Sequence, residues 1–278
     1  MEETQTTNGK IEHVTSLSAE PVFSIGHFSV TNALLTSWVA VLIIVILSVI
    51  ARLKQKNVPG KLQHFFEIIM DGALNLCDQV TGSRALSMKI FPVAISVFFF
   101  VLINNWLGIL PLTSFGLVSG NEMTPFLRSG TADLNTTLAL GVFAVIASNL
   151  FGIFTVGAWK VFNKYINLKV LKTMFTDVRK EPTVLIVAPI KFFVGIIEII
   201  GEIAKIASLS FRLFGNVFAG EVLITAMAAV FAYLIPVPFL FLEVLVGLIQ
   251  ALIFSMLTIV YFTIASQDHD EHEEHAHA

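Results

Sequence analysis

Long apolar stretches without charged residues constrain the fold of this chain more than any other feature. The first covers residues 33–51, contains no charged residue and has about the length that a helix needs to cross a bilayer. Similar stretches follow at residues 90–110, at 134–159 and through the C-terminal third. With 55% hydrophobic and 13% charged residues, the 278-residue chain lies outside the range of soluble globular domains. The sequence therefore predicts an all-α integral membrane protein.

Charges beside the first span predict the orientation of the chain. Residues 1–32 are mostly polar and are expected to form a loosely ordered arm, and Arg52, Lys54 and Lys56 follow the span. Because basic residues gather on the cytoplasmic flank of a span, this arm is predicted to lie outside. Residues 62–80 then show apolar positions with a period of about 3.6, which predicts an amphipathic helix along the cytoplasmic interface.

Residues 90–110 and 134–159 are predicted to form a hairpin of two spans. The loop between them holds one basic residue, Arg128, whereas several lysines and arginines follow the second of these spans, as a cytoplasmic segment requires. Asn104, Asn105 and Asn149 lie inside the spans. We expect Asn104 and Asn149 to form hydrogen bonds between helices.

The helical pattern of residues 182–234 is too long for one upright span. At 1.5 Å per residue it would extend about 75 to 80 Å, against roughly 30 Å for the hydrocarbon core. Two upright spans with a tight turn, or one long tilted helix, would both fit this length. A turn between Glu198 and Lys205 would interrupt a regular pattern, so we expect the tilted helix. Pro236 and Pro238 then mark an outer turn, and residues 239–265 return to the cytoplasm.

Five ionisable residues lie within the apolar pattern of residues 198–221. Each would cost roughly 2.5 to 3.5 kcal/mol at the bilayer centre, so a functional site or an ion-pair partner must offset this cost. At about 100° per residue, Glu198, Lys205 and Arg212 share one stripe of a helix, with Glu202 displaced by about 40°. Glu221 lies on about the opposite side, about 13 Å further along than Arg212.

The neighbours of Arg212 offer two interpretations of these charges. Many of them are small, including Ser208, Gly215 and Ala219, and small residues let another helix approach closely. Asn216 is displaced from the charged stripe by about 40°. The pattern fits a salt-bridged helix buried in a bundle, and it also fits a working site at a helix interface.

Glu243 and Gln250 are the polar residues of the returning helix. They are seven residues apart and therefore share one face. Glu243 lies near the outer turn, as does Glu221, so the two carboxyl groups could share one cavity and titrate as a coupled pair. Gln250 lies deeper and could form a hydrogen bond with Arg212 across the hairpin.

Residues 208–221, SLSFRLFGNVFAGE, resemble the signature of subunit a of F-type ATP synthases, the stator that channels ions past a rotating ring of c subunits. The resemblance continues in QALIFSMLTIVY at residues 250–261 and, more weakly, in NNWLGILP at 104–111 and TADLNTTLAL at 131–140. Together these segments extend from about residue 90 to 265. The family often has an acid where Gly108 stands, which argues against a proton-relay role for that helix.

The resemblance implies a role for each candidate residue. Arg212 would discharge the carboxyl group of a passing rotor subunit, with Asn216 and Gln250 beside it. Glu221, Glu243 and Asp133 would belong to an outer half-channel. Asn105 and Asn135 match family positions near the outer surface, which gives a hydrated entry path as the second interpretation of the polar residues there. Glu198 and Glu202 would belong to a cytoplasmic one.

The same resemblance implies a subunit without catalytic activity of its own. Its expected partners are the c-subunit ring, b-type peripheral stalk subunits, the rest of the ATP synthase and the lipid membrane. We expect the translocated ion to be the proton, and we expect no cofactor, metal or nucleic acid.

Two other function classes fit the sequence less well. A self-contained secondary ion transporter is the alternative, although such proteins usually show two similar halves and no internal repeat is seen. An intramembrane hydrolase lacks the necessary motifs, such as GxSxG or HExxH.

The two ends of the chain bear on where it is located. The polar start argues against a cleavable signal peptide, so we expect a bacterial plasma membrane, with an organellar membrane as the alternative.

Residues 33–266 would form one transmembrane domain, with the ion-channel hairpin at 182–266. The acidic, histidine-rich residues 267–278 would form a disordered cytoplasmic tail. Cys77 excludes a disulfide within the chain because it is the single cysteine.

Overall fold

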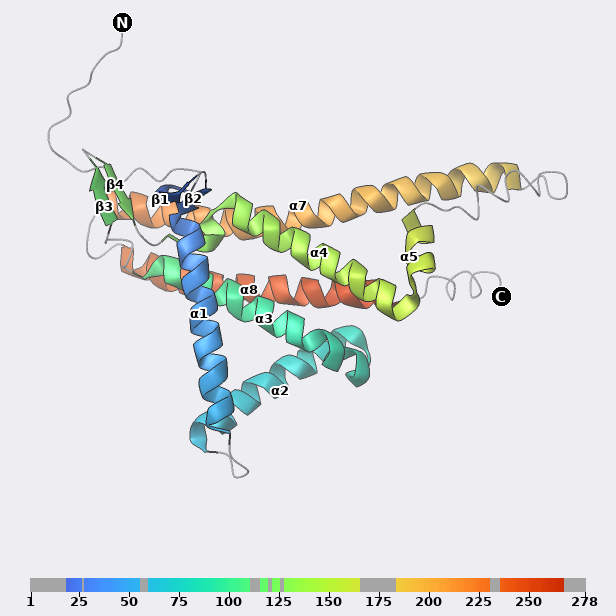
Figure 1. Cartoon of the computed structure of the whole chain (residues 1–278), viewed down its shortest axis with the longest axis horizontal. Coiled ribbons are helices and arrows are strands. Elements are labelled where there is room, and N and C mark those ends of the chain that lie inside the picture. The colour runs from blue at the N-terminus through green and yellow to red at the C-terminus, as the bar shows by residue number, and fades with distance from the viewer. Residues whose placement is uncertain are drawn as a thin grey trace, which may run out of the picture. The chain divides into compact units, whose positions relative to one another are not determined.

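The computed structural model is built almost entirely from helices (Figure 1). It describes residues 19–26, 28–55, 60–110, 116–119, 122–125, 128–165, 184–230 and 236–267. The helices are α1 (Asn32–Leu53), α2 (Lys61–Thr81), α3 (Arg84–Ile109), α4 (Leu134–Val156), α5 (Ala158–Tyr165), α7 (Val184–Val230) and α8 (Pro236–Ser266), with a short 3-10 helix η2 (Gly130–Ala132). Two antiparallel pairs of strands complete this list: β1 (Pro21–Ile25) with β2 (Phe28–Thr31), and β3 (Gly116–Ser119) with β4 (Glu122–Pro125).

Five helices of the described residues are long and apolar enough to cross a membrane: α1, α3, α4, α8 and residues 193–230 of α7. The amphipathic helix α2 is not among them. The chain is therefore an all-α integral membrane protein, as its sequence predicts. The interfacial position of α2 and the tilt of α7 stay predictions.

The chain divides into two compact units. The first contains residues 1–71, 95–137 and 211–255, and the second contains residues 72–94, 138–210 and 256–278. The candidate residues Arg212, Glu221, Glu243 and Gln250 belong to the first unit, and Glu198 and Glu202 belong to the second. The single transmembrane domain over residues 33–266 stays a prediction. Residues 1–18 of the predicted arm and 268–278 of the predicted tail lie outside the described residues.

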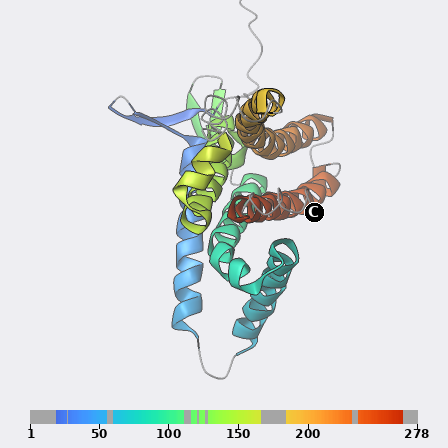
Figure 2. The same cartoon turned by 90° about the vertical axis from the view of Figure 1, so that its right-hand side faces the viewer.

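The β1–β2 hairpin directly precedes α1 (Figure 2). Ile25 pairs with Phe28, and Gly26 adopts the positive φ of 64° that this tight turn requires. The hairpin is fixed to the helix because Asn32 N donates to Glu20 O at 3.0 Å and Glu20 N donates to Asn32 Oδ1 at 3.3 Å. The prediction of a loosely ordered arm is wrong for these strands, because backbone pairing and the bonds to Asn32 order this part of the chain.

Two predicted helix boundaries also need correction. α3 begins at Arg84 rather than residue 90, and it accommodates Pro92. The third span ends at Val156, because Gly157 with a φ of 104° separates α4 from the short helix α5. α7 is one helix of 47 residues, as the single-helix interpretation expected. Pro236 and Pro238 lie in the first turn of α8, where proline is compatible with a helix.

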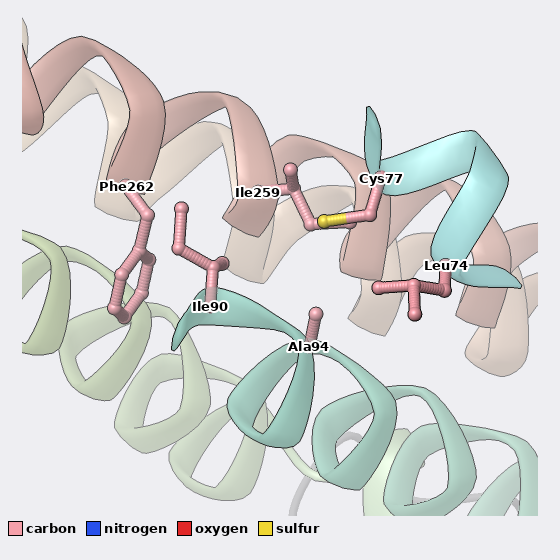
Figure 3. Packing of buried hydrophobic residues seen from close by; sticks show 6 residues of the cluster. All are labelled: Leu74, Cys77, Ile90, Ala94, Ile259 and Phe262. Carbon is pink, nitrogen blue, oxygen red and sulfur yellow. The ribbon is translucent and has the colours of Figure 1, made fainter. Parts of the chain in front are cut away.

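The second unit contains an apolar cluster contributed by α2, α3 and α8 (Figure 3). Its buried members are Leu74, Cys77, Ile90, Ala94, Ile259 and Phe262. In the same unit, α4 approaches its neighbours closely at two glycines. A Cβ atom on Gly141 would lie 2.6 Å from Ser210 Oγ, and one on Gly152 would lie 2.6 Å from Ala265 O. Small residues thus set helix separation here, as in other membrane bundles.

Cys77 is expected to resist alkylation in the folded protein. It is 0% exposed within the cluster, and burial raises the pKa of its thiol, which disfavours the reactive thiolate. We expect a maleimide to label native protein at least about 10-fold more slowly than denatured protein. A His64→Cys variant in a Cys77→Ser background provides the control, because the His64 side chain is 67% exposed on α2, which is not among the spans. If the native thiol of Cys77 and the thiol introduced at position 64 react at equal rates, the cluster does not protect Cys77.

Candidate functional site

Arg212 lies on an exposed face of α7. Gly215, Asn216 and Ala219 share this face and are also exposed, at the helical spacing of three and four residues. Leu213 and Val217 are buried on the other side at 0% and 7% exposure. The apolar packing of α7 therefore turns a cation and small residues outward, which leaves backbone and guanidinium accessible to another helix.

A polar contact across the α7–α8 hairpin joins Asn216 to Gln250. Asn216 Nδ2 donates to Gln250 Oε1 at 2.6 Å. Gln250 is 3% exposed, and its Nε2 has no hydrogen-bond partner among the described residues. The hydrogen bond predicted between Gln250 and Arg212 is wrong, because Gln250 Oε1 accepts instead from Asn216, one helical turn further along α7.

Glu243 is buried against the backbone of α7. It is 8% exposed, and a Cβ atom on Gly220 would clash with both oxygens of its carboxyl group. Gly220 therefore creates the space into which this carboxyl group points. Within the part of the chain that the structure describes, Glu243 forms no side-chain hydrogen bond or ion pair, so its carboxyl group lies against the helix backbone rather than in a salt bridge.

Glu221 is bound by an arginine that the sequence indicated only as a marker of orientation. Arg128 Nε donates to Glu221 Oε1 and Oε2, both at 3.1 Å, and Arg128 Nη2 donates to Oε2 at 3.0 Å. The arginine side chain is 5% exposed and that of the glutamate is 25% exposed. Glu243 contacts Gly220, the residue before Glu221, so the two acids lie at neighbouring positions. A cavity shared by their carboxyl groups stays a prediction.

The segment that carries Arg128 is held by α3. Ser129 Oγ donates to Asn104 O at 3.2 Å, and Thr131 Oγ1 donates to Asn105 Oδ1 at 2.6 Å. Gly108 permits this close approach, since a Cβ atom there would lie 3.0 Å from the Cα atom of Ser129. The absence of an acid at Gly108 therefore has a packing explanation: a side chain would displace the segment.

Asn104 and Asn105 connect the same region to α1 and α8. Asn104 Oδ1 accepts a hydrogen bond from Ser37 Oγ at 3.3 Å, which confirms the predicted interhelical bond. Asn105 Nδ2 donates to Gly247 O at 3.1 Å. Both side chains are thus occupied in packing α3 against its neighbours.

Asp133 caps a helix. Its Oδ1 accepts hydrogen bonds from the backbone N of Asn135 at 3.1 Å and from Asn135 Nδ2 at 3.3 Å, at the start of α4. Its predicted place in an outer half-channel stays a prediction, and its carboxylate has a structural task that needs no channel.

In the second unit, Glu202 forms an ion pair within α7. Lys205 Nζ lies 2.8 Å from Glu202 Oε1, and Asn149 Nδ2 donates to Glu202 Oε2 at 3.3 Å. The second bond confirms the interhelical role predicted for Asn149. Lys205 also lies over the ring of Tyr261, 5.4 Å from its centroid. Glu198 is half-buried on the same helix.

The roles of Arg128, Ser129 and Thr131 were missed from the sequence. One signal was available: Arg128 is the lone basic residue between the second and third spans, and it lies three residues before Thr131, where a segment that resembles the family begins. Side-chain pairing across 93 residues of sequence cannot be deduced from periodicity, however. Among the described residues, no group of three or more histidines, cysteines or acids could hold a metal ion.

The arrangement combines an exposed cation on α7, Arg212, with a half-buried acid on about the opposite face of that helix, Glu221, and a buried acid on α8, Glu243. Carboxyl groups can exchange protons, and an exposed guanidinium can pair with an acid of another helix. The family described as ATP synthase A chain matches residues 34–263.

Curated relatives are similar to this chain over most of their length. A protein of Mycobacterium bovis named ATP synthase subunit a is 34% identical over 247 residues, covering 87% of this chain and 89% of the relative. A protein of the same name from Gloeobacter violaceus is 32% identical over 241 residues, covering 87% and 86%. One from Geotalea daltonii is 29% identical over 230 residues, covering 83% and 85%. The chain belongs to the family of ATP synthase A chains.

Proposed function

We propose that this chain is the ion-conducting stator subunit of a rotary F-type ATP synthase and that it translocates protons. It has no catalytic site of its own in this proposal. It contributes two aqueous half-channels and a fixed cation beside a ring of c subunits, and b-type stalk subunits hold it in place. Ion flow is thereby coupled to rotation and to ATP synthesis elsewhere in the complex.

The exposed position of Arg212 carries this proposal. A charge in a membrane helix that served only to hold a bundle together would be turned inward, whereas Arg212 lies on the exposed face with Gly215 and Ala219. A rotor carboxyl group crosses lipid only when protonated, because its charged form is too costly there. Beside Arg212 the ionised form is stabilised, and the proton is released. Arginine suits this role because it does not lose its own charge.

Protons reach and leave this point by separate paths in the proposed mechanism. Glu221 and Glu243 belong to the outer half-channel, and Asp133 lies at its margin. Glu198 and Glu202 belong to the cytoplasmic half-channel. Each elementary charge that crosses yields about 2.3 kcal/mol per 100 mV, so several protons must cross for each ATP. Rotation accumulates these steps.

The proposed setting is a bacterial plasma membrane, with the N-terminus outside and the C-terminus in the cytoplasm. The bacterial origin of the relatives supports the first part. The distribution of lysines and arginines supports the second.

Isolation in mild detergent tests the proposal directly. We expect an affinity-tagged chain to co-purify with a ring of small, acid-containing proteolipids and with an ATP-hydrolysing head. A tagged single-span membrane protein from the same cells provides the control. Recovery of the chain alone, with ion transport activity after reconstitution, would instead support a secondary transporter.

A further inference from the structure

The ion pair between Arg128 and Glu221 is also a set of specific hydrogen bonds. Three donor–acceptor distances of 3.0 to 3.1 Å join the guanidinium to both carboxylate oxygens. Bidentate pairs of this kind are among the strongest hydrogen-bonded contacts in proteins. Protonation of Glu221 would weaken all of them and would remove this counter-charge from a cation that is 5% exposed.

Arg128 is held in place by the surrounding helices and cannot be regarded as a mobile surface residue. Ser129, directly after it, bonds to Asn104 O, and η2 follows at once. A Cβ atom on Gly130 would clash with Ser37 and Asn104, so the segment lies in direct contact with α1 and α3. The guanidinium is thereby fixed opposite α7.

Glu243, unlike Glu221, has no ion-pair partner among the described residues. Its carboxyl group contacts Gly220 and forms no hydrogen bond or ion pair with any residue in the described ranges. A change of charge on Glu243 therefore breaks no such bond in this part of the structure, whereas a change of charge on Glu221 breaks a bidentate pair. The two acids are neighbours with unequal freedom to exchange protons.

We propose that Arg128 is a positioning residue that keeps Glu221 as a fixed anion of the outer half-channel, so that Glu243 is the acid that exchanges protons there. This inference rests on the proposed function, and it divides between two residues a task that their sequence positions would assign to both. Glu221 sets the local charge, and Glu243 carries the proton.

Four variants of the assembled complex test this division: Glu221→Gln, Arg128→Gln, the double variant Arg128→Gln/Glu221→Gln, and Arg128→Lys. ATP-driven proton pumping is measured in vesicles and divided by the amount of complex that retains its proteolipid ring. Glu221→Gln removes the carboxylate that neutralises the Arg128 guanidinium, and we expect pumping to fall about 10-fold or more. The double variant removes both charges together, and we expect it to recover to within about 3-fold of wild type.

Arg128→Gln alone is expected to slow pumping because Glu221 then loses its counter-charge, and Arg128→Lys is expected to retain most of the wild-type rate. Glu243→Gln is expected to slow pumping about 100-fold whether Arg or Gln stands at position 128. Arg84→Gln serves as the matched control, because Arg84 forms an exposed pair with Asp78 at 2.6 Å in the second unit.

Two results would overturn the inference. A double variant no faster than Glu221→Gln would mean that Glu221 itself carries protons, and Arg128→Gln pumping at the wild-type rate per assembled complex would mean that the pair is merely structural. Because Arg128→Gln keeps Glu221, this second comparison remains decisive where Glu221→Gln fails to assemble. Arg212→Ala is measured in parallel: if it pumps normally, the proposed function fails, whereas its inactivity confines any failure to Arg128.

Discussion

Arg212→Ala is expected to abolish ATP synthesis in vesicles that hold normally assembled complex. The substitution removes the charge that stabilises the ionised rotor carboxylate, and it removes the barrier between the two proposed half-channels. We expect coupled synthesis to fall at least about 100-fold, the scale of losing a preorganised electrostatic group, and a passive proton leak to accompany this loss. Synthesis and proton flux are measured in the same vesicles.

Arg212→Lys is the more discriminating change at this position. Lysine keeps a formal charge but replaces the delocalised guanidinium with a compact ammonium that loses its proton more readily in a dry environment. We therefore expect coupled synthesis to fall at least about 10-fold despite the conserved charge. Arg84→Lys is a suitable control, because it makes the same exchange in an exposed ion pair with Asp78, away from the proposed half-channels. Near-normal synthesis by either Arg212 variant would identify Arg212 as a structural residue and reject the mechanism.

Replacing Glu221 and Glu243 together by Gln is expected to have the second largest effect. Glutamine keeps the volume and hydrogen-bonding capacity of each acid but cannot titrate. The outer half-channel would lose its fixed anion and its proton carrier, so we expect ATP-driven pumping to slow about 100-fold, the scale of losing an acid–base group.

The control for this double change is Glu67→Gln. Glu67 is an exposed acid of α2 that accepts a hydrogen bond from Gln63 at 2.9 Å, and glutamine can replace that acceptor. Normal amounts of assembled complex are required of all variants, as judged by the co-purified proteolipid ring. Undiminished pumping by assembled Glu221→Gln/Glu243→Gln complex would contradict an outer path through these residues.

The presence of the long helices follows from the sequence for a simple physical reason. An apolar stretch of membrane length must satisfy its backbone hydrogen bonds internally, and a helix does so with local contacts alone. The spans near residues 33–51 and 239–265 were therefore predictable, as was the continuity of α7. Boundaries were less predictable, because the start of α3 at Arg84 depends on the turn that joins it to α2 rather than on hydropathy.

The candidate site likewise has a part that the sequence predicted and a part that it could not predict. Spacing by sevens already placed Glu243 and Gln250 on one face of a helix, and the motif around Arg212 already indicated the family. Spacing could not choose the partner of Gln250, because Arg212 and Asn216 lie one turn apart and either could face it. The structure selects Asn216, since apolar burial of Leu213 and Val217 fixes the rotation of α7.

The sequence by itself thus determined the class of protein, its spans, its family and the identities of the ionisable residues, all of which depend on local composition, period or motif. Only the tertiary structure decided which of those residues meet. Arg128 reaches Glu221 because Gly108 and Gly130 let its segment approach α1 and α3, and Glu243 is buried because Gly220 leaves room for it. Such pairings depend on packing between segments that are distant in sequence, and the pattern within any one segment does not contain them.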